Sequence, residues 1–565
     1  MEQEVKKCQN CKKDFTIEPE DFVFYEKIKV PAPTFCPDCR TTRRTIFLNH
    51  VNLYKKVEAR EGKNVFSNYP EEAKIKIYDH DYWWSDKWSP MDYGTDVDFK
   101  KPFLEQIKQL NFSVPWPSRS VRGMVNSDYC NNASYLKNCY LCFNTNNEEN
   151  CQYCVGSNFA KDSLDCYASP KSELSYEVYQ GNSVFQCFYC SEVKNCRNLK
   201  FCEECTNCND CFGCFNLHNK NYYIWNKAYS KEEYFKELEK INFGSWDEVE
   251  KIKEKFEEFK LKLPRKYLHG NHNKNVTGEY IYRSKNTFDC FEVAECENVR
   301  YSQNFAPGVK DSYDYTNWGQ NSEMVYESCG CGDSCQNIKF CFDCWPAMQD
   351  SEYCLCCHSC SECFGCMGLR SKQYCILNKQ YTKEEYEELV VKIKKHMVDM
   401  PYVNKQGLKY TYGEFFPVEF SPLAYNETMA IEYFPKTKEE VTKEGYLWRD
   451  KIQGEYKITI EVSNIPDDIK NVTDDILNEV IRCDTCKNAF KLIKAEVDFY
   501  KRFSIPLPRL CFNCRHIERR RKSNPLKLWH RKCMKPGCTN EFETSYAPDR
   551  PEIVYCESCY QQEVY

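Results

Sequence analysis

Residues 202–214 read Cys-Glu-Glu-Cys-Thr-Asn-Cys-Asn-Asp-Cys-Phe-Gly-Cys, with a cysteine at every third position. The same spacing returns 152 residues later, at Cys354, Cys357, Cys360, Cys363 and Cys366. Both runs end in Cys-Phe-Gly-Cys and lead to an Asn-Lys-x-Tyr step, which begins at Asn226 and at Asn378. Self-similarity at a fixed offset indicates a repeat architecture, so the middle of this chain is a duplication.

A finer rhythm lies inside each half. Asn-Cys, Asp-Cys or Gln-Cys steps recur through the first half at Cys139, Cys151, Cys166, Cys187 and Cys196. Aromatic and small polar residues alternate around them, and helical periodicity is absent. Short strands with Asn, Asp, Ser or Gly corners, stacked as coils, fit this pattern. We therefore predict a mainly β fold with short helices and a right-handed parallel β-solenoid at its centre. A string of small independent knuckles is the alternative.

Helices are expected after each half. Ser230 with Glu233, and Thr382 with Glu385, form capping boxes, in which a hydroxyl precedes a helix and a glutamate stands at its third position. Another helix is expected after Ser245, with Val249, Ile252, Phe256 and Phe259 on one face. We expect these helices to cover the open ends of the solenoid.

The two ends of the chain also match each other. Cys8-x-x-Cys11 precedes Cys36-x-x-Cys39 by 24 residues, and Cys483-x-x-Cys486 precedes Cys511-x-x-Cys514 by the same 24. Both copies carry an aromatic-Tyr step and a Pro-x-Pro between the pairs: Phe24-Tyr25, Phe499-Tyr500, Pro31/Pro33 and Pro506/Pro508. A further pair of knuckles, Cys533-x₄-Cys538 and Cys556-x-x-Cys559, closes the chain.

Paired knuckles of this kind predict zinc. Zn²⁺ prefers four soft ligands in a tetrahedron, and a structural site has no open position. Small lobes with little apolar core need the free energy of metal binding to fold. We predict three structural Zn²⁺ ions, held by Cys8, Cys11, Cys36 and Cys39; by Cys483, Cys486, Cys511 and Cys514; and by Cys533, Cys538, Cys556 and Cys559.

A fourth ribbon is predicted without its metal. When the segment after Asn49 is aligned with the segment after Asn524, Glu58, Lys63, Asp79 and Tyr82 stand where the last four cysteines stand. Losing all four ligands together removes the ion cleanly, so packing must hold this lobe, and Trp83, Trp84 and Trp88 can supply it.

These features divide the chain into nine segments: a zinc ribbon (1–48), a degenerate zinc-free ribbon (49–90), a linker (91–125), repeat half 1 (126–228), a helical insert (229–275), repeat half 2 (276–380), a helix and linker (381–480), a zinc ribbon (481–525) and a C-terminal zinc ribbon (526–565).

The 28 central cysteines allow three interpretations. They can be small apolar side chains stacked inside narrow coils, where free cysteine packs well. They can also bind further zinc ions or an iron–sulfur cluster. Ferredoxin-type runs end in a Cys-Pro step, and no proline follows here. Metal content per chain separates these interpretations.

Basic residues cluster around the last two ribbons. A basic flank with interleaved aromatics can bind phosphates and stack bases, which predicts possible nucleic-acid contacts. The alternative is that the arginines neutralise the zinc–thiolate sites. The candidate contacts are Arg515, Arg519, Arg520, Arg521, Lys522, Lys527, Trp529, Arg531 and Lys532, and Arg40, Arg43 and Arg44 repeat the pattern near the start.

Composition narrows the functional classes. The net charge of −6 becomes −12 with three Zn(Cys)₄ sites, which argues against non-specific coating of nucleic acid. The start of the chain has no apolar signal segment, and no run approaches 18 apolar residues, so we expect a cytoplasmic protein with reduced thiols and no membrane contact. No P-loop, GxGxxG or GxSxG motif is present, so catalytic residues and an enzymatic activity are not predicted.

The terminal motifs resemble the probable zinc-ribbon domain of many small bacterial proteins. The wider layout, with Trp83-Trp-Ser-Asp-Lys-Trp, Tyr412-Gly-Glu-Phe-Phe-Pro and Arg550-Pro-Glu-Ile-Val-Tyr-Cys, is similar to a group of Cys-rich bacterial multi-ribbon proteins over nearly the whole chain. That group tends to keep cysteines near Asp79 and Tyr82, where this chain departs. Some members carry a CaiB/BaiF-type CoA-transferase label, and no residue pattern here supports that chemistry. The resemblance implies zinc binding.

Three functions remain open from the sequence. The first is a structural, non-enzymatic zinc scaffold whose solenoid surface binds a partner, most simply a protein. The second is RNA or DNA binding through the basic segment between the last two ribbons. The third is a metal or thiol-redox buffer that uses the central cysteines.

Overall fold

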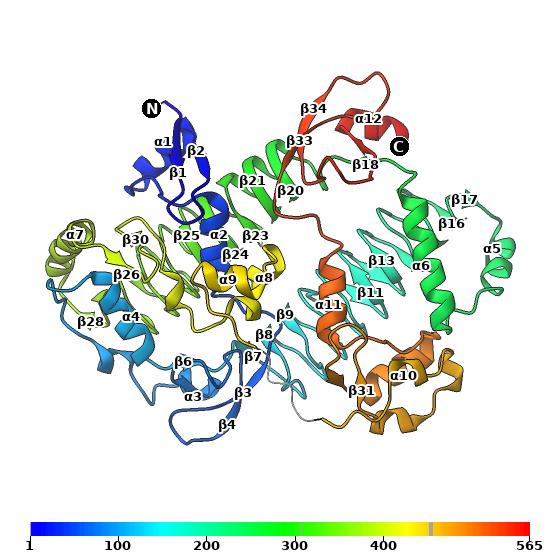
Figure 1. Ribbon diagram of the computed structural model, residues 1–565, viewed down its shortest axis with the longest axis horizontal. Helices are drawn as coiled ribbons and strands as arrows, with labels where there is room; N and C mark the ends of the chain where they lie inside the picture. Colours follow the sequence, from blue (N-terminus) through cyan, green and yellow to red (C-terminus); the bar gives the residue numbers. More distant parts are fainter. Residues whose placement is uncertain (1, 306, 451–455, 565) are drawn as a thin grey trace.

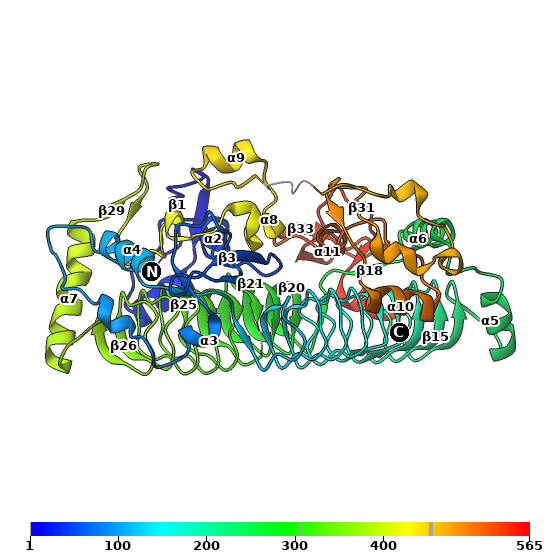
Figure 2. The same ribbon diagram turned by 90° about the horizontal axis from the view of Figure 1, so that it is seen from below.

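The computed structural model describes residues 2–305, 307–450 and 456–564. A parallel β-solenoid in two halves forms its base, and the terminal segments pack along one side of the coils (Figure 1, Figure 2). The two halves extend in opposite directions from the middle of the molecule, so that α5 and α7 lie at opposite ends. The prediction of a mainly β fold with a β-solenoid is confirmed, and independent knuckles are excluded for the repeats.

Each coil of half 1 contains 12 residues. Residues 12 apart pair in parallel, as in the series Lys137, Glu149, Lys161 and Glu173. Positive φ recurs at every third residue, so a coil has four sides of three residues with a left-handed residue at each corner. Asparagine tolerates this conformation, and its amide bonds the next coil: Asn138 Nδ2 donates to Asn150 Oδ1 at 3.0 Å.

The lumen explains the cysteines. One residue in three points inward, so only four side chains fill each coil, and the space admits small groups. The 14 cysteines of half 1 and 12 of those in half 2 line these lumens. Their thiols donate to main-chain carbonyls, as from Cys202 to Lys200 O at 3.4 Å. Cys329 and Cys356 instead pack outside the lumen, in the core beneath the N-terminal ribbon.

The strands are short because each side of a coil is short. Half 1 contains β7 (Val121–Arg122), β8 (Asn131–Ser134), β9 (Phe143–Asn146), β10 (Ser172–Glu173), β11 (Tyr176–Tyr179), β12 (Val184–Phe185), β13 (Phe188–Ser191), β14 (Arg197–Lys200), β15 (Asn209–Phe212) and β16 (Asn221–Ile224). Half 2 contains β19 (Gly270–Asn271), β20 (Lys274–Tyr282), β21 (Lys285–Ala294), β22 (Glu297–Arg300), β23 (Gln303–Phe305), β24 (Lys310–Trp318), β25 (Tyr326–Cys331), β26 (Ser361–Phe364) and β27 (Gln373–Ile376). Several coils of half 2 hold 13 residues, as in Lys310, Glu323, Gln336 and Gln349.

Each half ends in the same way. The last parallel strand turns back into an antiparallel partner, β17 (Lys227–Ala228) or β28 (Lys379–Gln380), and a helix follows, α5 (Lys231–Leu238) or α7 (Lys383–Asp399). The predicted capping boxes are formed, with Ser230 and Thr382 accepting from the amides of Glu233 and Glu385. The hairpin and helix close the open edge of the sheet.

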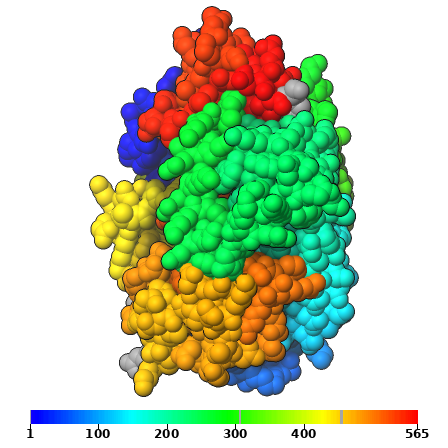
Figure 3. Space-filling view, turned by 90° about the vertical axis from the view of Figure 1, so that its right-hand side faces the viewer, coloured from blue at the N-terminus to red at the C-terminus, as the bar shows by residue number. Residues whose placement is uncertain are grey.

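Helix α6 (Trp246–Lys260) covers the outer face of half 1. Ser245 caps it, and Val249, Ile252 and Phe256 are buried, as predicted. Its last residue, Lys260, and Arg265 both pair with Glu203 of the solenoid at 2.8 Å. Figure 3 shows the helical insert (green) between ribbon two (orange) and ribbon three (red) at this end of the molecule.

The ion pairs of Glu203 with Lys260 and Arg265 predict that acid weakens the packing of α6 on the solenoid. Burial acts to raise the pKa of Glu203, but Lys260 and Arg265 outweigh it and lower the pKa from 4.5 to about 2. A lowered pKa stabilises the fold above the unfolded-state value, so we expect up to about 3 kcal/mol to be lost as pH falls from about 4.5 towards 2. Amide exchange of α6 measured across this range checks it. In Glu203→Gln the pH step should flatten, and an unchanged step would contradict the assignment.

The terminal segments form two pairs of ribbons. We call residues 1–48 ribbon one, 49–90 the relic ribbon, 481–525 ribbon two and 526–565 ribbon three. Ribbon one contains β1 (Glu4–Lys7), β2 (Asp14–Ile17), α1 (Pro19–Lys27) and α2 (Pro37–Thr45). Ribbon two repeats this order with β31 (Ile481–Arg482), β32 (Ala489–Phe490), α10 (Lys494–Phe503) and α11 (Phe512–Arg520).

The ribbons dock crosswise on the solenoid. Phe24 of ribbon one stacks on Tyr313 of half 2, with ring centroids 3.9 Å apart. Tyr500 of ribbon two meets Tyr176 of half 1 at 5.6 Å. The first ribbon in the chain therefore packs on the second half, and the ribbon after the halves packs on the first half. The duplicated aromatic-Tyr step is the apolar anchor in both interfaces.

Buried arginines complete these interfaces. Arg40 and Arg44 of α2 pair with Asp314 of half 2 at 2.9 and 3.2 Å. Arg515 and Arg519 of α11 pair with Asp165 of half 1, both at 2.8 Å. Both aspartates are fully buried. They stand 149 residues apart, the same offset that separates the Lys-Asp-Ser step at Lys161 from the one at Lys310. The duplication therefore preserved a docking site as well as a coil.

The second ribbon of each pair docks by strand pairing. In the relic ribbon β5 (Ile77–Tyr78) pairs with β6 (Trp116–Pro117), just before half 1. In ribbon three β35 (Val554–Tyr555) pairs with β18 (Arg265–Lys266), just before half 2. Arg265 and Trp116 are again 149 residues apart. Each terminal pair of ribbons thus bridges both halves.

The segment predicted as a linker and the segment predicted as a helix and linker both contain packed structure. Residues 91–125 contain α4 (Phe103–Ser113), whose Phe103, Leu104 and Ile107 are buried. Residues 381–480 contain β29 (Tyr402–Val403), β30 (Lys409–Tyr410), α8 (Met429–Tyr433) and α9 (Lys438–Lys443), and Phe415 and Phe416 are fully buried. Both segments therefore carry short helices or strands whose apolar side chains pack against the rest of the chain.

Candidate metal centres

The first knuckle of ribbons one and two is a tight hairpin turn. In ribbon one it joins β1 to β2: the Cys8 amide donates to Lys13 O at 2.9 Å, and Lys12 adopts φ 62°. In ribbon two the Cys483 amide donates to Asn488 O at 2.9 Å, and Lys487 adopts φ 60°. The left-handed residue turns the chain so that both sulfurs of the Cys-x-x-Cys face the same point.

The second knuckle begins a helix. Cys36 and Cys511 are the N-cap residues of α2 and α11, so Cys39 and Cys514 lie in the first helical turn. Free amides and the positive end of the helix dipole there favour thiolates. Amide hydrogen bonds also favour the thiolate of Cys483, in the first knuckle. Burial tends to raise the pKa of Cys483, but amide hydrogen bonds from Cys511 and Cys486 lower it to about 7.

The four sulfurs of each ribbon converge. In each set of predicted ligands all four sulfur atoms lie within 4.8 Å of one another. The sulfurs of Cys11 and Cys36 are 3.6 Å apart, and those of Cys486 and Cys511 are 3.7 Å apart. A tetrahedron with Zn–S bonds of about 2.3 Å has S···S edges of about 3.8 Å. The residues present therefore fit a four-coordinate soft metal ion with no open position.

Ribbon three achieves the same convergence with a longer first knuckle. Cys533 follows β33 (Trp529–Lys532), which pairs with β34 (Glu541–Thr544), and α12 (Glu557–Val564) begins after Cys556. The sulfurs of Cys538 and Cys556 are 3.9 Å apart. Burial tends to raise the pKa of Cys556, but hydrogen bonds from Ser558 and Asn540 lower it to about 6. The longer spacing does not prevent closure.

The relic ribbon keeps the fold of ribbon three without its sulfurs. β3 (Tyr54–Val57) and β4 (Asn64–Ser67) form the matching antiparallel hairpin, and α3 (His80–Trp83) follows β5 as α12 follows β35. The Glu58 carboxylate accepts the amides of Arg60 and Glu61, which in a zinc knuckle would face a sulfur. Arg60 lies 4.2 Å over the Tyr82 ring. A carboxylate and a cation–π contact stand where the other ribbons place their ligands. Trp83 packs against Trp84 and Trp88, at 5.0 and 5.9 Å.

The central cysteines mostly pack. All 28 are buried, and within the described residues the run from Cys202 to Cys214 forms no group with metal-ligand spacing. One luminal group does reach such spacing: Cys139, Cys142 and Glu148. Sequence reasoning missed Glu148, although it is the only carboxylate at an inward position among residues 121–217, a signal that the repeat frame reveals.

The fold buries some residues of the basic segment at the interface with the solenoid and leaves others exposed. The guanidinium groups of Arg515 and Arg519 are occupied by Asp165, and Arg520 lies between Glu292 and Glu432 at 3.3 and 3.4 Å. These three side chains pair with carboxylates at the interface and are therefore not available to bind phosphate. Trp529 and Arg531 are partly buried, while the exposed members of the predicted set are Arg521, Lys522, Lys527 and Lys532. Ion pairing with the solenoid, rather than neutralisation of zinc–thiolate charge, explains most of the arginines.

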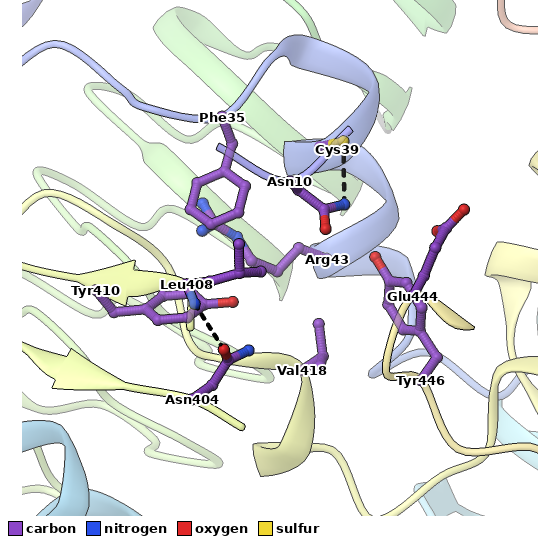
Figure 4. Close-up of a pocket in the computed structure, with 10 residues that line it drawn as sticks. All are labelled: Asn10, Phe35, Cys39, Arg43, Asn404, Leu408, Tyr410, Val418, Glu444 and Tyr446. Carbon is purple, nitrogen blue, oxygen red and sulfur yellow. Dashed lines mark hydrogen bonds between the residues drawn. The ribbon is translucent and has the colours of Figure 1, made fainter. Parts of the chain in front are cut away.

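The hollows near these centres are small or open. The pocket in Figure 4, between ribbon one and residues 404–446, has a volume of about 10 Å³, room for about one water molecule. Arg43, whose guanidinium carbon lies 4.2 Å from the Phe35 ring centroid, is one of the side chains that line it. A second hollow of about 350 Å³ lies between α4 and Tyr402, lined by Glu105, Lys108, Gln109 and Phe112. Neither hollow contains a histidine or a nucleophile paired with a base.

Comparisons with known proteins show no family for this chain. Among the described helices, none is long and apolar enough to cross a membrane. No family model matches the chain, and no curated protein matches it. Among solved structures, a putative acetyltransferase from Desulfovibrio desulfuricans G20 is similar over 51% of this chain and 85% of its own, at 9% identity and a TM-score of 0.09, which is too low to indicate a shared fold.

Proposed function

We propose that this protein is a non-enzymatic, zinc-dependent scaffold. Three structural Zn²⁺ ions hold ribbons one, two and three in shape, and the ribbons clamp the two halves of the solenoid together. The exposed coils then offer an extended, rigid surface to a partner, most simply another protein in the reducing cytoplasm. The observation that carries the proposal is the convergence of four sulfurs in each ribbon, at spacings that suit tetrahedral zinc and leave no position for a substrate.

Zinc content tests the metal part of the proposal. Replacing one ligand in each ribbon, with Cys39→Ser, Cys514→Ser and Cys559→Ser, should lower the zinc content by one ion per ribbon and by three in the triple variant. Elemental analysis of the purified full chain measures this. Cys205→Ser is the matched control, because Ser157 and Ser169 already occupy the same inward column; it should lose no zinc. Ribbon variants that keep their full zinc content would overturn the proposal.

The rival function is nucleic-acid binding, and the fold changes how it must be tested. Alanine at Arg519 or Arg520 would break ion pairs with the solenoid, so loss of binding would report unfolding. Arg521→Ala, Lys527→Ala and Lys532→Ala remove exposed charge instead. We expect no mobility shift of RNA or DNA at low salt with the unmodified chain. A salt-sensitive shift that this triple variant abolishes would replace the scaffold proposal with the rival.

The thiol-buffer function has little support from the geometry. A reactive thiol is exposed and ionised, whereas the central thiols are buried and donate hydrogen bonds to carbonyls. Under native conditions we therefore expect slow labelling of these thiols by alkylating reagents.

A further inference from the structure

One carboxylate interrupts the thiol and hydroxyl lining of half 1. The inward positions between Val121 and Leu217, all of which the structure describes, hold Cys, Ser, Thr, Ala, Gly, Val, Leu and Met, with Glu148 as the exception. Glu148 is 2% exposed. Burying a carboxylate in a narrow apolar tube is costly unless a hydrogen-bond donor or a cation compensates. The group is therefore balanced either by a partner in the lumen or by a proton of its own.

The protein itself satisfies only half of the carboxylate. The Thr145 hydroxyl donates to Glu148 Oε1 at 2.7 Å, which fixes the side chain across the lumen. Oε2 is buried and has no hydrogen-bond partner. No lysine or arginine occupies an inward position in this half among the described residues. A buried, oriented and unpartnered oxygen aimed into a lumen indicates that a ligand completes it.

Two sulfurs face the same point. The sulfur atoms of Cys139 and Cys142 and a carboxylate oxygen of Glu148 all lie within 4.8 Å of one another. All three residues come from one 12-residue coil, Cys139 and Cys142 from adjacent sides and Glu148 from the side opposite Cys142. Elsewhere the lumen holds many thiols, yet the run from Cys202 to Cys214 forms no comparable group among the described residues. Glu148 is what distinguishes this coil.

The next coil can supply a fourth ligand. Residues 12 apart stack in register, so Cys151 follows Cys139 and Cys154 follows Cys142, one strand spacing of about 4.8 Å along the lumen. Ala160 follows Glu148 in the same way and leaves space beside the carboxylate. In the preceding coil, Cys130 and Leu136 stand 12 residues before Cys142 and Glu148. The following coil, with Cys151 and Cys154, therefore offers more thiols to the site than the preceding one.

We propose that the lumen of half 1 holds a fourth metal ion, a thiophilic divalent cation of the Zn²⁺ class, bound by Cys139, Cys142 and Glu148 with Cys151 or Cys154 as the fourth ligand. Binding releases the protons of the coordinating thiols and of the carboxyl group to solvent, and the metal–sulfur and metal–oxygen bonds replace them. The ion is enclosed by the coils, so it enters as the solenoid assembles. This site is independent of the ribbons and goes beyond the proposed function.

Glu148→Gln tests the site because it keeps the side-chain shape and the Thr145 contact and removes a strong ligand. Chains produced with zinc should contain one ion more than the ribbons account for, and Glu148→Gln should contain one ion fewer than the unmodified chain. Crystals of the unmodified chain, measured at the zinc absorption edge, should show an anomalous peak inside the coil that contains Glu148. The control Cys205→Ser, at an inward position away from the cluster, should keep all of the zinc.

The melting temperature of Glu148→Gln gives an independent test of metal binding in the lumen. If a metal ion is bound, Glu148→Gln loses ligand free energy and its melting temperature falls. If the carboxyl group is simply buried and unpaired, the neutral amide leaves the melting temperature unchanged or raises it. A peak at each ribbon with none in the lumen, or a metal content that Glu148→Gln does not change, overturns the inference and leaves the ribbon sites standing. The anomalous map of the unmodified chain decides the matter even if the variant does not fold.

Discussion

Replacing Cys511 by serine is expected to remove the metal ion from ribbon two and to unfold that ribbon, while the solenoid stays folded. Cys511 is the N-cap residue of α11, and its sulfur lies 3.7 Å from that of Cys486. Without the ion, the three remaining sulfurs of the two knuckles have nothing to hold them together. Structural zinc contributes about 10–16 kcal/mol to lobes of this kind, far more than their small apolar cores supply.

The loss should be visible at the interface with half 1. Phe499 and Tyr500 pack against Tyr176, so unfolding of ribbon two should break this contact. Limited proteolysis should therefore cleave residues 481–525 in Cys511→Ser and spare residues 121–224. Cys205→Ser serves as the control and should resist cleavage throughout. Protection of ribbon two in the zinc-free variant would show that packing alone holds it, as we infer for the relic ribbon.

Asp165→Asn is expected to destabilise the docking of ribbon two by about 3–5 kcal/mol, because it leaves two buried guanidinium groups without their counter-charge. Arg515 and Arg519 both lie 2.8 Å from this carboxylate, and both are at most 5% exposed. The midpoint of the urea transition that releases ribbon two measures the change. Asp314→Asn should have the matching effect on ribbon one, through Arg40 and Arg44.

Two further variants separate charge from packing. Glu149→Gln breaks the Lys137–Glu149 pair, in which both partners are more than a third exposed, and should leave the urea midpoint almost unchanged because solvent screens the pair. Asp165→Leu combined with Arg515→Met and Arg519→Met replaces the buried ions by apolar groups and should recover much of the lost stability. A shift for Asp165→Asn no larger than for Glu149→Gln would show that the ion pairs do not anchor the ribbon.

The three-residue cysteine spacing was the strongest local predictor of the fold. A side chain that must be small at every third position leaves few options besides a narrow coil, and asparagine at the intervening corners supplies the left-handed turns. The capping boxes at Ser230 and Thr382 and the apolar face of α6 were readable for the same reason: each is a local pattern with a local physical cause. The pairing of two sulfurs within each knuckle also follows from short-range geometry.

The role of the arginines beside the ribbons could not be predicted from the local sequence. In the sequence, Arg515, Arg519 and Arg520 resemble a surface that binds phosphate. Their partners, Asp165, Glu292 and Glu432, are distant in the chain and come from three different segments. No local pattern specifies that a helix will lie against those carboxylates. Glu148 is a similar case, because an inward position is defined only once the 12-residue frame of the coils is known.

The sequence by itself determined the elements: repeated coils built on small inward residues, helices that begin at hydroxyl caps, and knuckles that bring sulfurs together over a few residues. Only the tertiary structure decided that ribbon one packs on half 2 and ribbon two on half 1, and which charges become buried. Propensity and spacing act within one coil, one turn or one knuckle, whereas docking depends on the complementarity of surfaces hundreds of residues apart. In this protein the charges of α2 and α11 meet matching carboxylates on the solenoid, and that match fixes the crosswise assembly.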